Sequence, residues 1–558
     1  MKKACLPIRL VIVCLMAGLL LVSCSAPTST PTQGPGTTPT PVPTAEPADP
    51  FGKYEPAITI TSVRDIPNPA VVKYPEGQDV ENNVWITTIR EELGIEVQYD
   101  WVVDASQLST RINAMITSGD FPDFFMCSSA QFNELGSAGL LADLTGAYDA
   151  YASDAFKSAM DDAGQAVIAS ATRDGALMGL PIIASKEFGP MLWVRTDWLE
   201  ALDLEEPETI EDVIAIAKAF ATQDPDGNQV NDTFGIPVNG NTSGGLMWAL
   251  GFMNSLGSYP MIWTENDHGD LVYGSITENT KNALGRLREL YDAGAIDPEF
   301  ITKDYWATYD PLTSGKYGIV YGPYYISISP LQPIVNNNDK AQFKPFPLLG
   351  PDGNAKTQQA SPTSGYYVVR KDCAHPEAVI KLMNFWYREF YFSPDQARYE
   401  KMINGPEFTS IYSSTPIMSY MPWANLDNIL EAKRCFDGEI TEDQIPPIGR
   451  QSYQDVLKYK NGDIAAWMWE RVYTALTTVM TVNRDGDLIQ PDRNLAPPGE
   501  AMSLKWGTLS AMEMEAFSRI ISGESPIEAF DTFVTEWKAA GGDEVTAEIN
   551  TWFDTQQP

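Results

Sequence analysis

The sequence predicts an α/β protein whose folded part forms two large lobes. The chain has 558 residues, of which 44% are hydrophobic and 11% aromatic, and single hydrophobic cores stop growing at about 250–300 residues. From residue 57 onward, stretches typical of strands alternate with stretches typical of helices. This alternation favours lobes that each contain a helix-covered, mostly parallel sheet. The last third of the chain has mainly helical patterns.

The individual elements follow from hydrophobic periodicity and from residues that begin or end helices. β-Branched runs and period-2 alternation indicate strands, whereas apolar residues three and four apart indicate helices. Gly94 is expected to end the first helix, and Thr209 with Asp212 can cap a later one. The predicted order is strand 57–65, helix 80–93, strand 95–103, helix 108–116, strand 121–125, strand 191–196, helix 209–220, helix 278–293, strand 316–321, strand 366–370, helix 376–390 and a helix with a capping box at 525–528 that ends at 541–542.

The first 24 residues indicate the compartment. A basic start precedes an apolar run at 10–22, which is too short to span a membrane and typical of a secretory signal. The run ends in Leu-Val-Ser-Cys24, which resembles the lipobox of bacterial lipoproteins. We therefore expect a signal peptide at 1–23, palmitate-type acyl chains on Cys24 and a place on the extracellular face of the bacterial cell membrane. An ordinary signal peptide with an incidental cysteine is the alternative.

Residues 24–54 are expected to form a tether. Proline, threonine and serine dominate this stretch and apolar residues are almost absent, so no core can form there. At roughly 3 Å per residue, an extended segment of this length could hold a domain up to about 90 Å from the membrane.

Composition excludes several classes of function. Acidic residues outnumber basic ones 74 to 38, and the formal charge of −36 makes nucleic acid an improbable partner because phosphate backbones are repelled. The chain has two histidines and no GxSxG, P-loop, GxGxxG or HExxH motif, which argues against cofactor and Ser–His chemistry. A glycosidase needs only two carboxylates, so composition leaves that class open. Cys127, Cys373 and Cys435 form no C-x-x-C pair and are expected as free thiols, with one disulfide as the alternative.

One loop has the spacing of a calcium site. Oxygen side chains occupy positions 1, 3, 5 and 9, and a backbone carbonyl is available at position 7. Position 6 is Gln229 rather than glycine, and position 12 is Gly235 rather than the usual glutamate. A solvated turn rich in Asp and Asn is the alternative, and any bound Ca2+ is expected to be structural. The five candidate ligands are Asp224, Asp226, Asn228, Val230 and Asp232.

Aromatic residues near predicted strand ends could bind sugars. Sugar rings present apolar C–H faces that rest against indole or phenol rings, and their hydroxyls need amide or carboxylate partners. For each aromatic residue, core packing is the alternative. Asp123 and Arg195 lie at strand ends, where α/β sheets present ligand-contacting groups, with a salt bridge as the alternative. The aromatic candidates are Trp101, Trp248, Trp306, Tyr324, Tyr325 and Trp469.

Several local motifs, in collinear order, resemble one family. Together they are similar to carbohydrate-type extracellular solute-binding proteins of ABC importers, in the branch of large Gram-positive lipoproteins and alginate-oligosaccharide binders. The motifs are SGDFPDFF (118–125), LADLT (141–145), GALMGLPI (175–182), LWVRTDWLEAL (192–202), DPDGNQVNDTFGI (224–236), YDAGAIDPEF (291–300), GKYGIVYGPYY (315–325) and the tail at 523–553.

The resemblance implies a clamshell in which two α/β lobes close on a ligand. It implies an N-lobe of residues 55–181 plus about 362–395, and a C-lobe of residues 182–361 plus about 396–558. Hinge crossings would fall near 180–183 and 361–367. The family's ligand-stacking aromatic would correspond to Tyr324 or Tyr325, and its calcium loop to the loop at 224–232.

The leading functional hypothesis is capture of a carbohydrate without catalysis. A monomeric binding protein would hold a neutral oligosaccharide and deliver it to the permease subunits of an ABC importer, attached to the membrane only by its lipid. The alternatives are an anchored glycosidase and a surface binding or sensory lipoprotein without transport. Some members of such families bind peptides or other small solutes, so a ligand of that kind is the alternative to a sugar.

Overall fold

The computed structural model describes residues 48–67, 72–240, 246–405 and 410–556. The predicted signal peptide, the acylated Cys24 and most of the predicted tether lie outside these residues. Within the described part of the chain, no helix combines the length and apolarity needed to cross a membrane.

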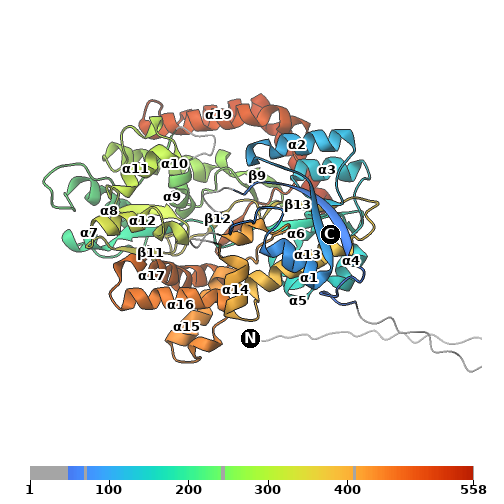
Figure 1. The fold of residues 1–558 in the computed structure, drawn as a ribbon. Coiled ribbons are helices and arrows are strands. Elements are labelled where there is room, and N and C mark those ends of the chain that lie inside the picture. Colours follow the sequence, from blue (N-terminus) through green and yellow to red (C-terminus); the bar gives the residue numbers. More distant parts are fainter. Residues whose placement is uncertain (1–47, 68–71, 241–245, 406–409, 557–558) are drawn as a thin grey trace, which may run out of the picture. The chain divides into compact units, whose positions relative to one another are not determined.

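Strands and helices alternate from β1 to β3, as predicted, and the helices α3–α6 and the strands β4–β6 follow them (Figure 1). Gly94 ends the first helix with a φ of 65°, the left-handed conformation expected of it. The elements are β1 Ile58–Asp65, α1 Val84–Leu93, β2 Ile95–Val103, α2 Ala105–Ser118, β3 Phe124–Cys127, α3 Ser129–Ser137, α4 Thr145–Tyr151, α5 Asp154–Ala163, α6 Gln165–Ser170, β4 Thr172–Arg173, β5 Ala176–Leu177 and β6 Leu180–Ile183.

The middle of the chain builds a second set of strands and helices. Thr209 and Asp212 form the predicted capping box at the start of α8. The elements are β7 Met191–Arg195, α7 Thr196–Ala201, α8 Ile210–Thr222, α9 Leu250–Ser255, β8 Trp263–Glu265, β9 Leu271–Tyr273, α10 Glu278–Asp292, α11 Tyr305–Thr313, β10 Ile319–Gly322, α12 Leu331–Asn337, β11 Phe343–Phe346, β12 Thr357–Gln359 and β13 Thr363–Val369.

The last third is mainly helical, as predicted. The predicted helix that begins with a capping box at 525–528 instead starts at Ala529, after a turn in which Ala529 N donates to Pro526 O at 3.0 Å. The elements are α13 Glu377–Tyr391, α14 Gln396–Ile403, α15 Ala424–Phe436, α16 Pro447–Lys460, α17 Trp467–Thr474, α18 Thr481–Asp485, β14 Ile489–Pro491, α19 Glu500–Ser522, α20 Ala529–Trp537 and α21 Asp543–Gln556.

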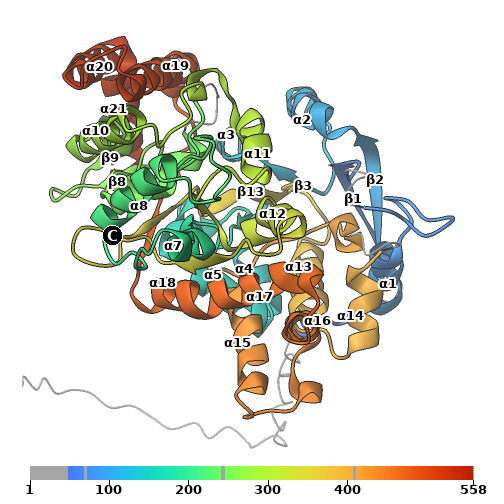
Figure 2. The same cartoon turned by 90° about the vertical axis from the view of Figure 1, so that its left-hand side faces the viewer.

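The strands form mixed sheets rather than the mostly parallel sheets predicted. β1 and β2 pair in parallel, and Figure 2 shows them side by side. β13, however, lies between β3 and β6 and is antiparallel to both, and β7 lies between β10 and β11 in the same manner. Hydrophobic patterns identify a strand but not its direction. The orientation of β13, which returns late in the chain to pair with β3 and β6, therefore could not be assigned from the sequence.

The hydrophobic core is divided into three clusters of buried residues. The first cluster contains residues from 60–183 and 366–424. The second and third contain residues from 191–349 and 426–553. Trp85, Trp386 and Trp537, which lie on helical stripes in the sequence, are each at most 1% exposed. α14 and the segment after it pack in the first cluster, beyond the limit of residue 395 that the resemblance implies.

Residues 50–54 pack on the folded unit, so the predicted tether does not extend as far as residue 54. Asn384 Nδ2 donates to Pro50 O at 3.0 Å, and Lys381 Nζ donates to Gly52 O at 2.7 Å. Tyr54 OH donates to Glu377 Oε1 at 2.8 Å. Composition suggested a tether because proline dominates the stretch before it, but these contacts from α13 fix the last residues on the folded unit.

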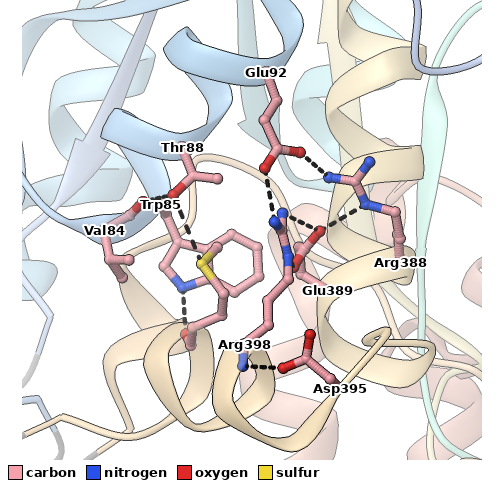
Figure 3. A network of polar contacts seen from close by, with 9 residues as sticks. Val84, Trp85, Thr88, Glu92, Arg388, Glu389, Asp395 and Arg398 are labelled. Atoms are coloured by element: carbon pink, nitrogen blue, oxygen red, sulfur yellow. Dashed lines mark hydrogen bonds and ion pairs between the residues drawn. The ribbon is translucent and has the colours of Figure 1, made fainter.

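Four charged side chains join α1, α13 and α14 (Figure 3). Glu92 accepts hydrogen bonds from Arg388 at 2.6 Å and from Arg398 at 2.7 Å. Glu389 is fully buried and accepts from the same two arginines, at 2.6 Å in each case. Burial alone would raise the pKa of Glu92, but the hydrogen bonds from Arg398 and Arg388 lower it below its ordinary value. We call these four residues the ion cluster.

Candidate functional site

Three chain segments pass between the first core cluster and the other two. They comprise residues 184–190, residues 350–365 and Asn425. Ala184 N donates to Pro362 O at 2.9 Å, and Asn425 Nδ2 donates to Glu187 at 2.7 Å, so the three segments lie together. The resemblance in sequence implied two crossings and missed the third, because nothing in the local pattern around residue 425 marks a change of core.

Glu187 connects the first crossing to the third. Its fully buried carboxylate accepts hydrogen bonds from Asn425 Nδ2 at 2.7 Å, Leu426 N at 2.6 Å and Ser185 Oγ at 3.1 Å. Leu426 N belongs to the first turn of α15, where backbone N–H groups lack intrahelical acceptors. Burial raises the pKa of Glu187 to about 7, although these hydrogen bonds act in the opposite direction. The contacts fix the segment that carries Phe188.

A cavity of about 350 Å³ lies against the crossings, and we call it the aromatic cavity. The crossings supply Phe188, Pro190 and Ser361 to its wall. Trp248 forms another part of the wall and stacks on Tyr305 with ring centres 4.8 Å apart and planes 8° apart. The rest of the wall is largely apolar and includes Met247, Leu250, Met261, Ile262, Tyr321, Tyr325 and Ile326.

A second cavity of about 300 Å³ lies between residues of β1 and of β13, and we call it the β1–β13 cavity. The end of β1 contributes Arg64, and β13 contributes Tyr367. Arg64 is already engaged: its guanidinium donates to the carbonyls of Ser413 at 3.0 Å and Thr415 at 3.1 Å. Tyr420, which is 40% exposed, belongs to the same wall.

Four aromatic residues connect the two cavities. Phe188 lies with its ring centre 6.4 Å from that of Tyr324, 5.7 Å from that of Tyr325 and 6.2 Å from that of Tyr420. Phe188 and Tyr325 are 41% and 43% exposed, although large apolar rings are usually buried. Exposed apolar rings that face concave walls are typical of ligand sites. We call Phe188, Tyr324, Tyr325 and Tyr420 the aromatic bridge.

The structure places the predicted aromatic residues in three kinds of position. Trp248 and Tyr325 line the aromatic cavity, and Tyr324 belongs to the bridge. Trp306 is 71% exposed and contacts the cavity residue Tyr305 edge-on at 5.1 Å. Trp101 and Trp469 are half-buried and pack against the first and third core clusters.

Asp123 and Arg195 both take part in ion pairs, the alternative that the sequence left open. Asp123 accepts from Arg370 at 3.1 Å and from Thr61 N at 2.9 Å, which connects β3 to β1. Arg195 is 3% exposed and donates to Asp197 at 2.7 Å while its guanidinium lies 4.3 Å from the Trp198 ring. Both side chains therefore stabilise strand ends.

Sequence reasoning missed Phe188, Tyr420 and Asp492 of this region. All three lie in irregular segments, where neither period 2 nor period 3.6 separates exposed positions from buried ones. In the sequence, the one indication of a binding role is that each is a large apolar or charged residue within a segment that joins two elements.

A family model decides the assignment. The model of the bacterial extracellular solute-binding proteins matches residues 89–389, which is more than half of the chain. The chain belongs to this family. Members of this family are extracellular solute-binding proteins, and binding of a solute requires no catalytic cofactor.

Relatives and solved structures agree with the family. Lipoprotein LipO of Bacillus subtilis is 22% identical over 85% of this chain and 89% of its own length. The fructooligosaccharide ABC transporter substrate-binding protein FusA of Streptococcus pneumoniae is 25% identical over 42% of this chain and 44% of its own. An extracellular solute-binding protein from Bifidobacterium longum subsp. infantis has a TM-score of 0.62 at 16% identity, covering 91% of this chain and all of that one. The predicted two-lobe α/β fold is thereby confirmed.

In this solute-binding protein, the predicted calcium loop is a compact turn. Asp224 accepts hydrogen bonds from Asn228 N at 3.1 Å and Gln229 N at 3.0 Å. Gln229 has a φ of 63°, the left-handed conformation for which calcium loops use glycine at this position. Asp232 accepts from Lys316 at 3.3 Å. Among the described residues, no group of three or more His, Cys, Asp or Glu side chains is arranged to hold a metal ion.

Proposed function

We propose that this chain is the lipid-anchored substrate-binding component of an ABC importer. It captures a neutral oligosaccharide between two lobes at the aromatic bridge and delivers it to the permease. The observation that carries the proposal is the aromatic bridge, which joins a cavity on the first core cluster to a cavity on the other two. Ligand that contacts both walls would favour the closed form, because closing adds contacts that the open form lacks.

The proposal assigns the two lobes to the core clusters. Residues 48–183 and 366–424 form one lobe, residues 191–349 and 426–556 form the other, and the three crossings between them act as the hinge. Crossing segments that are joined by hydrogen bonds and by Glu187 would move as a unit, while the two cores stay intact.

A neutral ligand fits the charges near the bridge. Among the described residues that line the two cavities, Arg64 is the only basic side chain, and backbone carbonyls already occupy it. A uronate would therefore meet no available cation. The names of two relatives include a neutral and an acidic ligand. FusA is named as a fructooligosaccharide ABC transporter substrate-binding protein, and YtcQ of Bacillus subtilis is named as a polygalacturonan/rhamnogalacturonan-binding protein.

The proposed ligand contacts are Trp248, Tyr324 and Tyr325, joined by Phe188 and Tyr420. Rings of this kind stack on the C–H faces of a sugar. Trp306 would contact a ligand long enough to pass Tyr305. Lipidation of Cys24 would keep the protein on the outer face of the membrane, as the name of lipoprotein LipO suggests for that relative.

A thermal-shift screen with mono- and oligosaccharides tests the proposal. Ligand at 100 times its Kd should stabilise the folded state by about 2.7 kcal/mol, and the recovered sugar should be chemically intact. Stabilisation by peptides but by no sugar would overturn the carbohydrate assignment. Release of shorter sugars would support the glycosidase alternative instead.

We also propose a structural Ca2+ in the loop at 224–232. The carboxylates of Asp224, Asp226 and Asp232, the Asn228 side chain and the Val230 carbonyl would supply hard oxygen ligands. Ca2+ should raise the melting temperature, and chelation should lower it, in the wild type but not in Asp226→Asn with Asp232→Asn. Equal responses of the two proteins would contradict a metal site in this loop.

A further inference from the structure

Within the aromatic cavity, Asp492 is the only charged side chain among the described lining residues. Its Oδ1 accepts hydrogen bonds from Trp263 N and Asn494 N, each at 3.0 Å. Oδ2 accepts no hydrogen bond from any described residue. The neighbouring Arg493 does not compensate this charge, because it pairs with Glu265 at 3.2 Å. One carboxylate oxygen is thus available to a ligand in the cavity.

Other polar groups of the wall are already engaged. Gln358 accepts from Asn254 Nδ2 at 2.7 Å and donates to Pro260 O at 3.1 Å. Ser361 Oγ donates to Thr363 O at 2.7 Å. Among the described lining residues, Asp492 is therefore the one that brings a carboxylate oxygen without a donor, in a wall that also contains Met247, Leu250, Met261, Ile262 and Ile326.

One residue of the apolar wall, Met261, is held in a defined backbone conformation. Met261 has a φ of 67°, which side chains other than glycine rarely adopt. Its N–H donates to Ser275 Oγ at 2.8 Å, and Ser275 in turn donates to the buried carboxyl of Glu513 at 2.8 Å. Strained backbone that persists at a cavity wall is often found at ligand sites.

A bare hydroxylated sugar fits this wall poorly. One hydroxyl can donate to Asp492 Oδ2, but it brings no apolar group to the side chains of the wall, and further hydroxyls that enter there lose their hydrogen bonds to water. A substituent that combines one N–H donor with one methyl group would match both the free oxygen of Asp492 and the apolar side chains of the wall. Its N–H would donate to Asp492 Oδ2, and its methyl would contact the apolar side chains.

We propose that the aromatic cavity recognises an acetamido group, so that the ligand is an oligosaccharide that contains N-acetylamino sugars. This inference rests on the proposed function and narrows it to one class of neutral sugar. Burial raises the pKa of Asp492 to about 6, while hydrogen bonds from Trp263 N and Asn494 N act in the opposite direction, so the carboxylate is ionised and accepts hydrogen bonds at neutral pH.

Calorimetric titration of matched sugar pairs tests the inference on the full folded chain. Each pair contains a glucose oligomer and its 2-acetamido counterpart, in β-1,4 and β-1,3 linkage. The wild type should bind the acetamido member at least tenfold more tightly. Asp492→Asn keeps the Oδ1 acceptor for the two backbone N–H groups and replaces Oδ2 by a donor, so it should reduce that preference to below threefold.

Two further variants keep the test decisive. Met261→Gln alters the apolar wall without touching Asp492 and should also reduce the preference. Phe392→Ala, at an exposed position outside both cavities, should change neither the affinity for the glucose oligomer nor that for its acetamido counterpart. Equal binding of both members by the wild type, or an undiminished preference in Asp492→Asn, would overturn the inference and leave the proposed function intact. Binding of neither member, nor of any other sugar, would overturn the proposed function itself.

Discussion

The ion cluster and the aromatic cavity use charge in opposite ways. In the ion cluster, Glu92 and Glu389 each accept hydrogen bonds from two arginines at 2.6–2.7 Å. In the aromatic cavity, Asp492 has one oxygen without a donor among the described residues, and Tyr325, which lines the same cavity, is 43% exposed. Groups that are fully paired stabilise the fold. Groups that are left unsatisfied, next to exposed rings, are available for binding.

Removing a partner from the ion cluster should produce the largest effect on stability. Glu389→Ala would leave Arg388 and Arg398 without their buried acceptor, and loss of one partner of a buried pair costs about 3 kcal/mol or more. Urea unfolding would measure this loss, with saccharide affinity unchanged. Glu515→Ala removes an exposed ion pair to Arg519 and should cost less than about 1 kcal/mol. Equal losses in the two variants would show that the cluster does not stabilise the fold.

Glu513 should make the stability depend on pH. Burial raises its pKa to about 7, against the hydrogen bonds from Tyr273 and Ser275. A folded-state pKa above the unfolded value means that the stabilising contribution is complete below about pH 4.5 and is lost as pH rises through about 7. The contribution of Glu513 to the free energy of unfolding should change by on the order of 3 kcal/mol across this pH range. Melting temperatures of the wild type should fall more steeply between pH 5 and 8 than those of Glu513→Gln. Parallel curves would contradict this assignment.

Truncating the bridge should weaken binding without affecting the fold. Tyr325→Ala removes a ring that is 43% exposed, so the melting temperature of the free protein should change little. Loss of one stacking contact, about 1.4 kcal/mol, corresponds to roughly tenfold weaker affinity by calorimetry. Phe392→Ala removes a ring that is 54% exposed elsewhere on the surface and should leave affinity unchanged. Unchanged affinity in Tyr325→Ala would exclude the bridge from the binding site.

The sequence predicted most elements because their signals are local. Gly94 ends α1, Thr209 and Asp212 cap α8, and Trp85 and Trp386 lie in the core, as their positions in helical patterns indicate. Strand direction was not predictable, since β13 pairs with β3 and β6 only after the chain returns from the other lobe. The start of α20 was placed too early because Ser525 forms no cap in the structure.

The site was only partly predictable. Trp248, Tyr324 and Tyr325 stand out as aromatic residues near strand ends, and the structure brings them close to one another. Phe188, Tyr420 and Asp492 come from crossings and loops, so only tertiary contacts bring them to the same region. Asp123 and Arg195 lie at strand ends as predicted, but Arg370 and Asp197 pair with them in space.

X-ray scattering with and without bound saccharide tests the central claim most directly. The account predicts that a saturating oligosaccharide lowers the radius of gyration and that the wild type loses this response when Tyr325 and Phe188 are both changed to alanine. An unchanged radius of gyration in wild-type protein shown by calorimetry to be saturated would contradict capture by closure of two lobes.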